Sequence, residues 1–167
     1  MTELDLSRAS TAKVQTFYGM FSGCSGLKRI DLSLFDTSSA VSLSYLFADC
    51  SKLEAVNVVG INTSSVIDFN HMFSGCTSLA SLDLSSFDTA AAKNLSYLFY
   101  GCSSLAALDL SSFDTAAAKN LSYLFFGCSS LASLDLFSFD TSNVETMENL
   151  FWGCTKLAEV TLGESFA

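Results

Sequence analysis

Six cysteines recur at one fixed interval, and this spacing constrains the fold more than any other feature of the chain. They are separated from one another by 26 residues throughout, at Cys24, Cys50, Cys76, Cys102, Cys128 and Cys154. A fixed period between about 20 and 50 residues is typical of a solenoid, in which each unit buries its apolar face against its neighbours. The period predicts one solenoid domain over residues 1–167, with six 26-residue repeats followed by a terminal strand.

Composition narrows the range of partners. Half of the 167 residues are hydrophobic, which is enough for a sizeable continuous core. The net charge of −9 disfavours nucleic acid and anionic membranes, because both bind surfaces rich in Lys and Arg. No apolar run is long enough to span a bilayer, and the residues after Met1 resemble no export signal.

A leucine pattern follows each cysteine and predicts a short strand. The pattern is Leu-x-x-Leu-x-Leu, as in Leu79, Leu82 and Leu84, and it matches the start of the leucine-rich repeat phrase. Its last three residues alternate apolar, polar and apolar, which is typical of a strand with one buried side. We expect seven such strands, from 4–6 to 160–162, all parallel because an identical crossover leads to each.

The second half of each repeat predicts a short helix. Its apolar residues have helical spacing, as in Ala118, Leu121, Leu124 and Phe125. A threonine precedes the apolar residues in every copy and is expected to cap the helix, and a glycine follows them in most copies and is expected to end it. The threonines are Thr11, Thr37, Thr63, Thr89, Thr115 and Thr141. The expected fold class is therefore α/β, a leucine-rich-repeat solenoid in which seven short parallel strands alternate with six short helices.

The cysteines are expected to be buried thiols. All six occupy the same repeat position, so they should form one column in which the side chains point the same way. Disulfides and metal binding are the alternatives. Tetrahedral zinc sites use closely spaced cysteine pairs, and the chain has none. We expect no metal and no cofactor.

Two longer phrases resemble a known family. Residues 72–89, with Phe-Ser-Gly-Cys, Leu-Asp-Leu and Phe-Asp-Thr, and residues 139–154, with Phe-Asp-Thr-Ser-Asn-Val, resemble the 26-residue repeat of BspA-type bacterial surface proteins. That family is allied to the leucine-rich repeats of bacterial cell-surface proteins and mycoplasma lipoproteins. The resemblance implies an extracellular or cell-surface location and a binding or adhesion role, and it offers no catalytic residues. The chain departs from the family pattern by lacking a signal, a lipobox and a wall anchor, and by Ala-Ala-Ala in place of Ser-Asn-Val.

One row of acidic positions is the first candidate site. The middle residue of each expected strand should project from one sheet face in single file. Like charges on neighbouring strands repel, so a row that keeps them tolerates a cost. One interpretation is an acidic concave surface for a basic partner or Ca²⁺, and the other is a solvated face that discourages aggregation. The row comprises Asp5, Asp31, Asn57, Asp83, Asp109 and Asp135.

An aromatic row is the second candidate. Tyr100, Phe126 and Trp152 share one repeat position just before the glycine. Exposed aromatic side chains are typical of binding hot spots, but stacked rings can equally be packing. The single histidine, His71, has no nucleophile or acid placed beside it by the repeat, so we expect no enzyme.

These observations predict a non-enzymatic protein-interaction or adhesion module that binds through a solenoid face. The expected partner is a protein or cell-surface ligand, a basic one if the acidic row is the binding surface, with no nucleic acid and no membrane insertion. The alternative is an engineered or consensus-like scaffold with no native ligand, since copies 76–101 and 102–127 differ at only three positions. The unprotected ends also predict weak end-to-end self-association.

Overall fold

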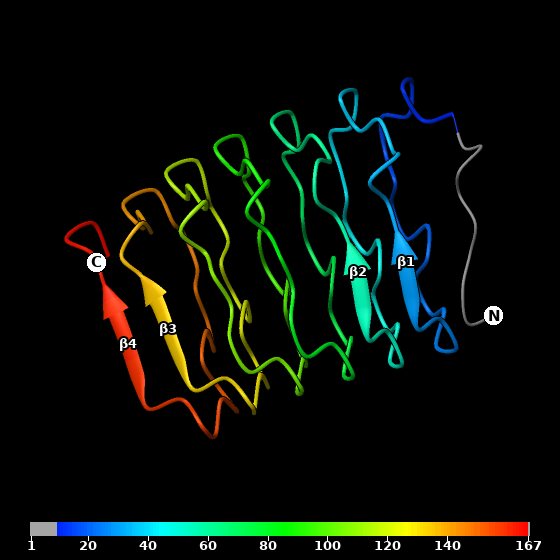
Figure 1. Cartoon of the computed structure of the whole chain (residues 1–167). Coiled ribbons are helices and arrows are strands. Elements are labelled where there is room, and N and C mark those ends of the chain that lie inside the picture. Colours follow the sequence, from blue (N-terminus) through cyan, green and yellow to red (C-terminus); the bar gives the residue numbers. More distant parts are fainter. Residues whose placement is uncertain (1–9, 167) are drawn as a thin grey trace.

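The computed structural model describes residues 10–166 as a stack of similar coils along one axis (Figure 1). Its strands are β1 (Arg29–Asp31), β2 (Ala55–Asn57), β3 (Ser133–Leu136) and β4 (Glu159–Leu162). β1 pairs with β2 and β3 with β4, both in parallel. Arg29 lies opposite Ala55 and Ser133 opposite Glu159, so each pairing joins residues one repeat apart. Adjacent copies therefore lie in register.

The prediction of seven strands was wrong for the part of the chain that the structure describes. That part has four strands in two separate two-stranded sheets. Residues 82–84 and 108–110 form no strand, and residues 4–6 lie outside the described range. Beside these central segments the backbone contacts from Ala106 N to Ala80 O and from Ala132 N to Ala106 O are 3.5 Å long. Such distances exceed those of ordinary ladder hydrogen bonds, so the coils separate at the middle of this face.

The predicted helices were also wrong, because residues 10–166 contain none. In residues 95–101 alternate N–H groups donate to the next coil rather than within the segment. Leu95 donates to the Asn120 carbonyl at 3.1 Å and Tyr97 to the Ser122 carbonyl at 3.0 Å. Between them, the Leu98 N–H donates back to the Leu95 carbonyl at 3.3 Å. The segment is thus a series of tight turns joined to the adjacent coil, and the α/β class does not hold.

Coil spacing explains why helices do not fit. Packed helices need about 8–10 Å between their axes. On this side of the stack the rings of Tyr45 and His71 are 4.4 Å apart, and those of His71 and Tyr97 are 4.2 Å apart. Tyr97 also has a φ of 59°, in the left-handed region that a right-handed helix excludes. The turns place apolar residues inward at intervals that resemble those of a helix, so the sequence pattern misled the prediction.

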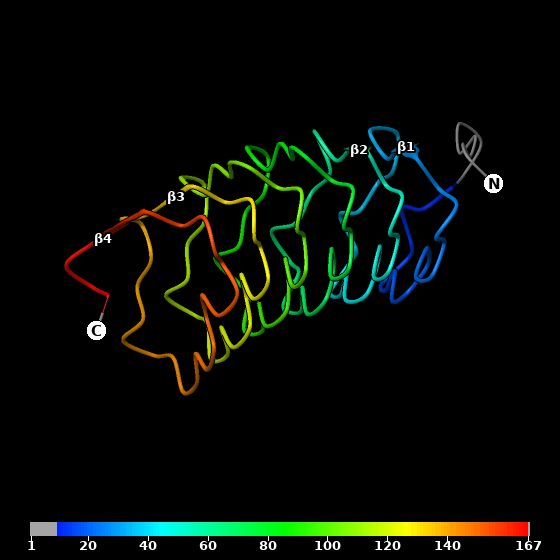
Figure 2. The same cartoon turned by 90° about the horizontal axis from the view of Figure 1, so that it is seen from below.

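The core is a continuous column inside the coils, with the strands along one side and the turns opposite (Figure 2). Phenylalanine rings stack along it in successive coils. The ring centroids of Phe47 and Phe73 are 5.6 Å apart, those of Phe73 and Phe99 6.1 Å, and those of Phe99 and Phe125 5.9 Å. All four side chains are fully buried. Each coil thus covers the apolar face of the next, as a solenoid requires.

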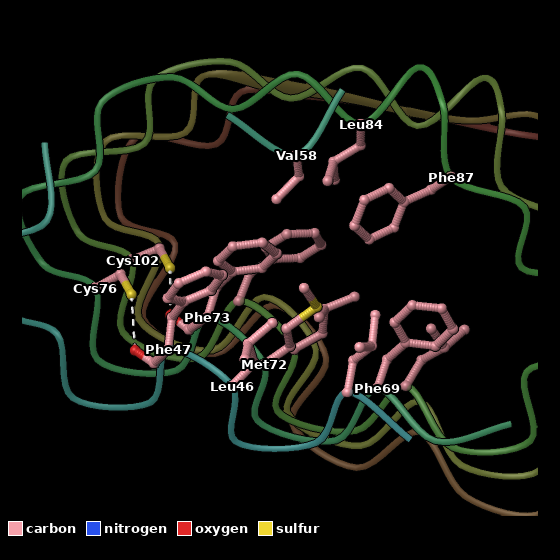
Figure 3. Packing of buried hydrophobic residues seen from close by; sticks show 14 of the residues in the cluster. Leu46, Phe47, Val58, Phe69, Met72, Phe73, Cys76, Leu84, Phe87 and Cys102 are labelled. Atoms are coloured by element: carbon pink, nitrogen blue, oxygen red, sulfur yellow. Dashed lines mark hydrogen bonds between the residues drawn. The ribbon is translucent and has the colours of Figure 1, made fainter. Parts of the chain in front are cut away.

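All six cysteines are free thiols, and those of the inner coils are buried. Each inner thiol donates a hydrogen bond to a phenylalanine carbonyl of the preceding coil, such as Cys76 to Phe47 at 3.2 Å (Figure 3). Burial raises the pKa of Cys50 to about 11 and that of Cys128 to about 12. The prediction that all six thiols would be buried was wrong for Cys24, in the first coil, which is exposed, and for Cys154, which is half-buried.

This burial gives a testable difference in thiol reactivity. The thiolate is the reactive form, so a raised pKa and a buried sulfur both slow alkylation. At pH 8, iodoacetamide should modify Cys24 in minutes and Cys50 and Cys128 at least about 100-fold more slowly. Peptide mass spectrometry measures each rate, and all six cysteines should react alike in urea. Equal rates in the native protein would contradict the buried column.

The repeated threonines have a different role from the predicted helix caps. Each inner threonine hydroxyl joins two coils. Thr89 Oγ1 donates to the Asp114 carbonyl at 2.8 Å and accepts from the Asp114 N–H at 2.9 Å. Thr63 and Thr115 bridge the next coil in the same way. The threonine row therefore fixes the spacing of adjacent coils at the corner where a helix was expected to begin.

Candidate functional site

The acidic row lies along the strand side of successive coils, and its described members are all exposed. β1 and β2 place Asp31 directly opposite Asn57, one coil apart. Each side chain accepts a hydrogen bond from the backbone N–H of the residue two positions later. These bonds, 2.8–3.1 Å long, run to Asp31, Asn57, Asp83, Asp109 and Asp135 from Ser33, Val59, Ser85, Ser111 and Phe137. Asp5 lies outside the described residues.

These turn bonds explain why the row tolerates repeated carboxylates. Hydrogen bonds from Ser33, Ser85 and Ser111 lower the pKa of Asp31, Asp83 and Asp109 below the ordinary 3.8. A lowered pKa in the folded state contributes stability above the unfolded value, and that contribution is lost as pH falls through the lowered value. The carboxylate is thus an acceptor within these three turns, and a local structural role accounts for a short polar acceptor at this position.

A pocket opens between two coils at the C-terminal end of this row. It has a volume of about 260 Å³ and is lined by Leu108, Asp109, Leu110, Ser111, Asp135, Phe137 and Ser138. It lies beside the central segment where no strand pairing joins the coils. Phe137 is 68% exposed at its edge. Two carboxylates and one exposed ring therefore flank the same opening.

Phe137 was missed by the sequence analysis, although the repeat contains a signal for it. The equivalent residues in four earlier copies are Ser33, Val59, Ser85 and Ser111. Phe137 is therefore larger than its equivalents in these copies. Because its side chain is exposed, core packing does not explain the phenylalanine. Such a departure at an exposed position is the kind of feature that indicates binding.

The face that carries the acidic row is not the concave surface that one of the two interpretations assumed. In the part of the core on the acidic side, the ring centroids of Phe113 and Phe139 are 6.5 Å apart. On the opposite side, the rings of Tyr97 and Tyr123 in the same region are only 4.6 Å apart. The coils therefore spread on the acidic side and crowd on the turn side. The hollow on the acidic side is the local pocket.

A second acidic row runs parallel to the first, and the sequence analysis did not single it out. Each accepts a backbone hydrogen bond from the residue two positions later, at 2.9–3.0 Å. Most of these side chains are exposed, and Asp140 is half-buried. The row therefore adds negative charge at the neighbouring corner of each coil. Its members are Asp36, Asn62, Asp88, Asp114 and Asp140.

The aromatic row is a stack whose inner rings are packed. The rings of Tyr100 and Phe126 lie 4.8 Å apart and nearly parallel, and those of Phe126 and Trp152 lie 4.6 Å apart. Their faces cover one another along the coil axis. Trp152 is 64% exposed and has no ring partner beyond Phe126 in the described coils. Packing accounts for Tyr100 and Phe126, and only Trp152 presents an open ring face.

His71 belongs to a neighbouring aromatic stack. Its ring lies between those of Tyr45 and Tyr97, and its Nδ1 is 2.7 Å from Asn70 Oδ1. Burial lowers the pKa of His71, although Asp49 and Asp68 oppose this shift. Within residues 10–166 no group of three or more His, Cys, Asp or Glu side chains is arranged to hold a metal ion. Nor does that range contain a helix of the length and apolarity needed to cross a membrane.

The register, the core column and the side-chain rows define a repeat protein of stacked coils with leucine-rich-repeat-like sequence. The chain belongs to the family described as "Mycoplasma protein of unknown function, DUF285", whose model matches residues 1–107 and 79–162. A search of curated proteins gave no match.

Two solved structures are similar to the chain, both of leucine-rich repeat proteins. One is the T. pallidum protein TpLRR, with 18% identity, a TM-score of 0.39 and coverage of 96% of this chain and 63% of that one. The other, from Bacteroides ovatus ATCC 8483, has 18% identity, a TM-score of 0.31 and coverage of 99% and 65%. The chain thus spans slightly less than two thirds of either structure.

Proposed function

We propose that the chain is a protein-interaction module that binds a basic, extended segment of a partner protein along the acidic row. The observation that carries the proposal is the pocket in which Asp109 and Asp135 flank the exposed Phe137. The adjoining Asp83 and the second acidic row extend the negative surface beyond the pocket. With a net charge of −9, the whole chain attracts cationic partners over a distance.

The chemistry of the pocket suits an arginine or lysine side chain. A carboxylate has about four acceptor sites, so the single backbone bond at Asp109 or Asp135 leaves capacity for a cation. Charged guanidinium–carboxylate hydrogen bonds are stronger than neutral ones. The Phe137 ring offers apolar surface to the alkyl stem of the ligand and a cation–π contact to its head.

A variant that removes charge without removing the turns tests this proposal. Asn57 already occupies the row and accepts the same backbone bond, from Val59 at 3.1 Å. The triple variant Asp83→Asn/Asp109→Asn/Asp135→Asn should therefore fold normally. Fluorescence anisotropy with a labelled nona-arginine peptide should show about tenfold weaker binding than wild type, because three lost charged pairs at about 0.5 kcal/mol each remove about 1.5 kcal/mol.

A matched control separates this surface from overall charge. Glu145→Gln/Glu148→Gln/Glu164→Gln removes the same number of charges from exposed positions elsewhere. Its affinity for the peptide should fall by less than about threefold. Phe137→Ser, which restores the residue of the other copies, should weaken binding without loss of charge. Equal losses in the two triple variants, or no effect of Phe137→Ser, would overturn the proposed site.

We propose further that this binding serves adhesion at a bacterial cell surface. The support is the resemblance of residues 72–89 and 139–154 to the surface-protein repeat. Mild protease treatment of intact cells that express the native gene should digest the protein while a cytoplasmic marker survives. Protection equal to that of the marker would contradict a surface location.

A further inference from the structure

The two ends of the coil stack carry complementary rows of backbone groups. In the inner coils, four N–H groups of each turn segment donate to four carbonyls of the next coil, as from Tyr123 to Glu148 at 2.8 Å. The equivalent N–H groups of the last coil make no hydrogen bond to any described residue, and they belong to Met147, Asn149, Phe151 and Gly153. The equivalent carbonyls of the first coil are likewise unpaired in the described chain, and they belong to Thr16, Tyr18, Met20 and Ser22. One end therefore offers donors and the other offers acceptors at the same spacing.

The repeat sets how these rows would meet in two copies. Equivalent positions in the first and last coils are separated by whole periods of 26 residues. A second copy that continues the stack would place its Thr16 carbonyl at the Met147 N–H and its Phe21 ring on Phe151. The stacking of Phe125 on Phe151, at 6.0 Å, is the pattern that this contact repeats. Residues 157–166 of the first copy occupy the repeat positions of residues 1–10 of the second, so the incoming copy contributes its coils from residue 11 onward.

The charges of the two ends also differ in sign. Residues 10–35 contain three basic residues and one acidic residue, whereas residues 142–166 contain four acidic residues and one basic residue. Arg29, Ala55, Ser133 and Glu159 share one repeat position, and the structure pairs the first two and the last two across coils. Continuation of the stack would therefore place Glu159 of one copy opposite Arg29 of the next. Ion pairs between residues one repeat apart already exist, as Lys28 Nζ to Glu54 Oε1 at 2.8 Å.

We propose that copies of this chain associate head to tail, with the C-terminal coil of one copy docking on the N-terminal coil of the next. β4 of the first copy pairs in parallel with β1 of the second, and the two backbone rows complete their hydrogen bonds. Such a contact uses two different surfaces, so it propagates rather than closing at a dimer. The contact goes beyond the proposed binding of a basic segment and uses a different part of the molecule.

A charge swap tests the register of this contact. Arg29 and Glu159 are both exposed, so exchanging either should leave the fold intact. Sedimentation velocity from about 10 µM to about 1 mM at low salt should show a mass that rises past the dimer. Arg29→Glu alone and Glu159→Arg alone should each lower the association constant by roughly threefold to tenfold. The double variant Arg29→Glu/Glu159→Arg should restore it.

A second readout uses the exposed thiol of the first coil. Alkylation of Cys24 should slow as wild-type concentration rises, because the last coil of the preceding copy covers this thiol in a continued stack. A monomeric wild type at about 1 mM, a mass that stops at the dimer, or no rescue by the double charge swap would overturn the proposal.

Discussion

Replacement of Phe99 by alanine is expected to lower the free energy of unfolding by about 3–5 kcal/mol. Phe99 is fully buried, and its ring stacks between those of Phe73 and Phe125 at 6.1 and 5.9 Å. The change removes apolar area from the centre of the column and leaves a cavity that neighbouring coils cannot fill without losing their register. A repeat array shares its stability between neighbours, so the damage should reach the coils on both sides.

Urea denaturation followed by tryptophan fluorescence and circular dichroism measures this loss. Phe151→Ala is the matched control, because Phe151 occupies the same repeat position in the last described coil and is only half-buried. Its cost should be less than about half that of Phe99→Ala, since less apolar area leaves water. Equal costs for the two variants would show that the column is not continuous.

Replacement of Thr89 by valine is the second change with a large expected effect, about 2–4 kcal/mol. Valine has nearly the same shape, so the loss arises from hydrogen bonds rather than from packing. The Thr89 hydroxyl, 1% exposed, bonds both the carbonyl and the N–H of Asp114. Without it two backbone groups are left without their partner, and leaving a buried polar group unpaired costs about 1–3 kcal/mol.

Two controls isolate this effect. Thr89→Ser keeps the hydroxyl and should cost no more than about 1 kcal/mol, the contribution of a methyl group. Thr77→Val removes an exposed hydroxyl that also bonds the adjacent coil, through the Ser51 carbonyl at 3.0 Å. It should cost less than about 0.5 kcal/mol. If Thr89→Val were as mild as Thr77→Val, the threonine row would not be what holds the coils together.

The features that depend on the period were predictable from the sequence. The 26-residue interval indicated parallel coils in register, and the pairing of Arg29 with Ala55 confirms this. The uniform position of the cysteines indicated one column of free thiols, and the structure contains it. Both inferences rest on symmetry, because equivalent residues in identical units must have equivalent surroundings.

The backbone of the turn segments was not predictable in the same way. Residues such as Leu121, Leu124 and Phe125 face inward in a helix and equally in a series of tight turns, so hydrophobic spacing cannot distinguish the two. What decides is the partner of each N–H group, which lies 25 residues away in the next coil. Tyr123 also adopts a left-handed φ of 60°, a conformation rare for aromatic residues. Propensity favours the helix here, and contact between coils overrides it.

The candidate site was likewise predictable from the sequence only in part. The acidic row was visible as a repeated position, and its described members are exposed in successive coils. The pocket was not visible, because it depends on the separation of two coils beside Asp109 and Asp135 rather than on any one residue type. Phe137 marks the place, but only a comparison of this position across all copies would have shown it.

The central claim is that alternate N–H groups of each inner turn segment are hydrogen-bonded to the adjacent coil rather than within the segment. Scalar couplings across hydrogen bonds, measured by NMR on perdeuterated protein, report donor and acceptor directly. We predict correlations from the Leu95 nitrogen to the Asn120 carbonyl carbon and from the Tyr97 nitrogen to the Ser122 carbonyl carbon, across contacts of 3.1 and 3.0 Å. Correlations from these nitrogens to carbonyls four residues earlier, as in an α-helix, would contradict the account.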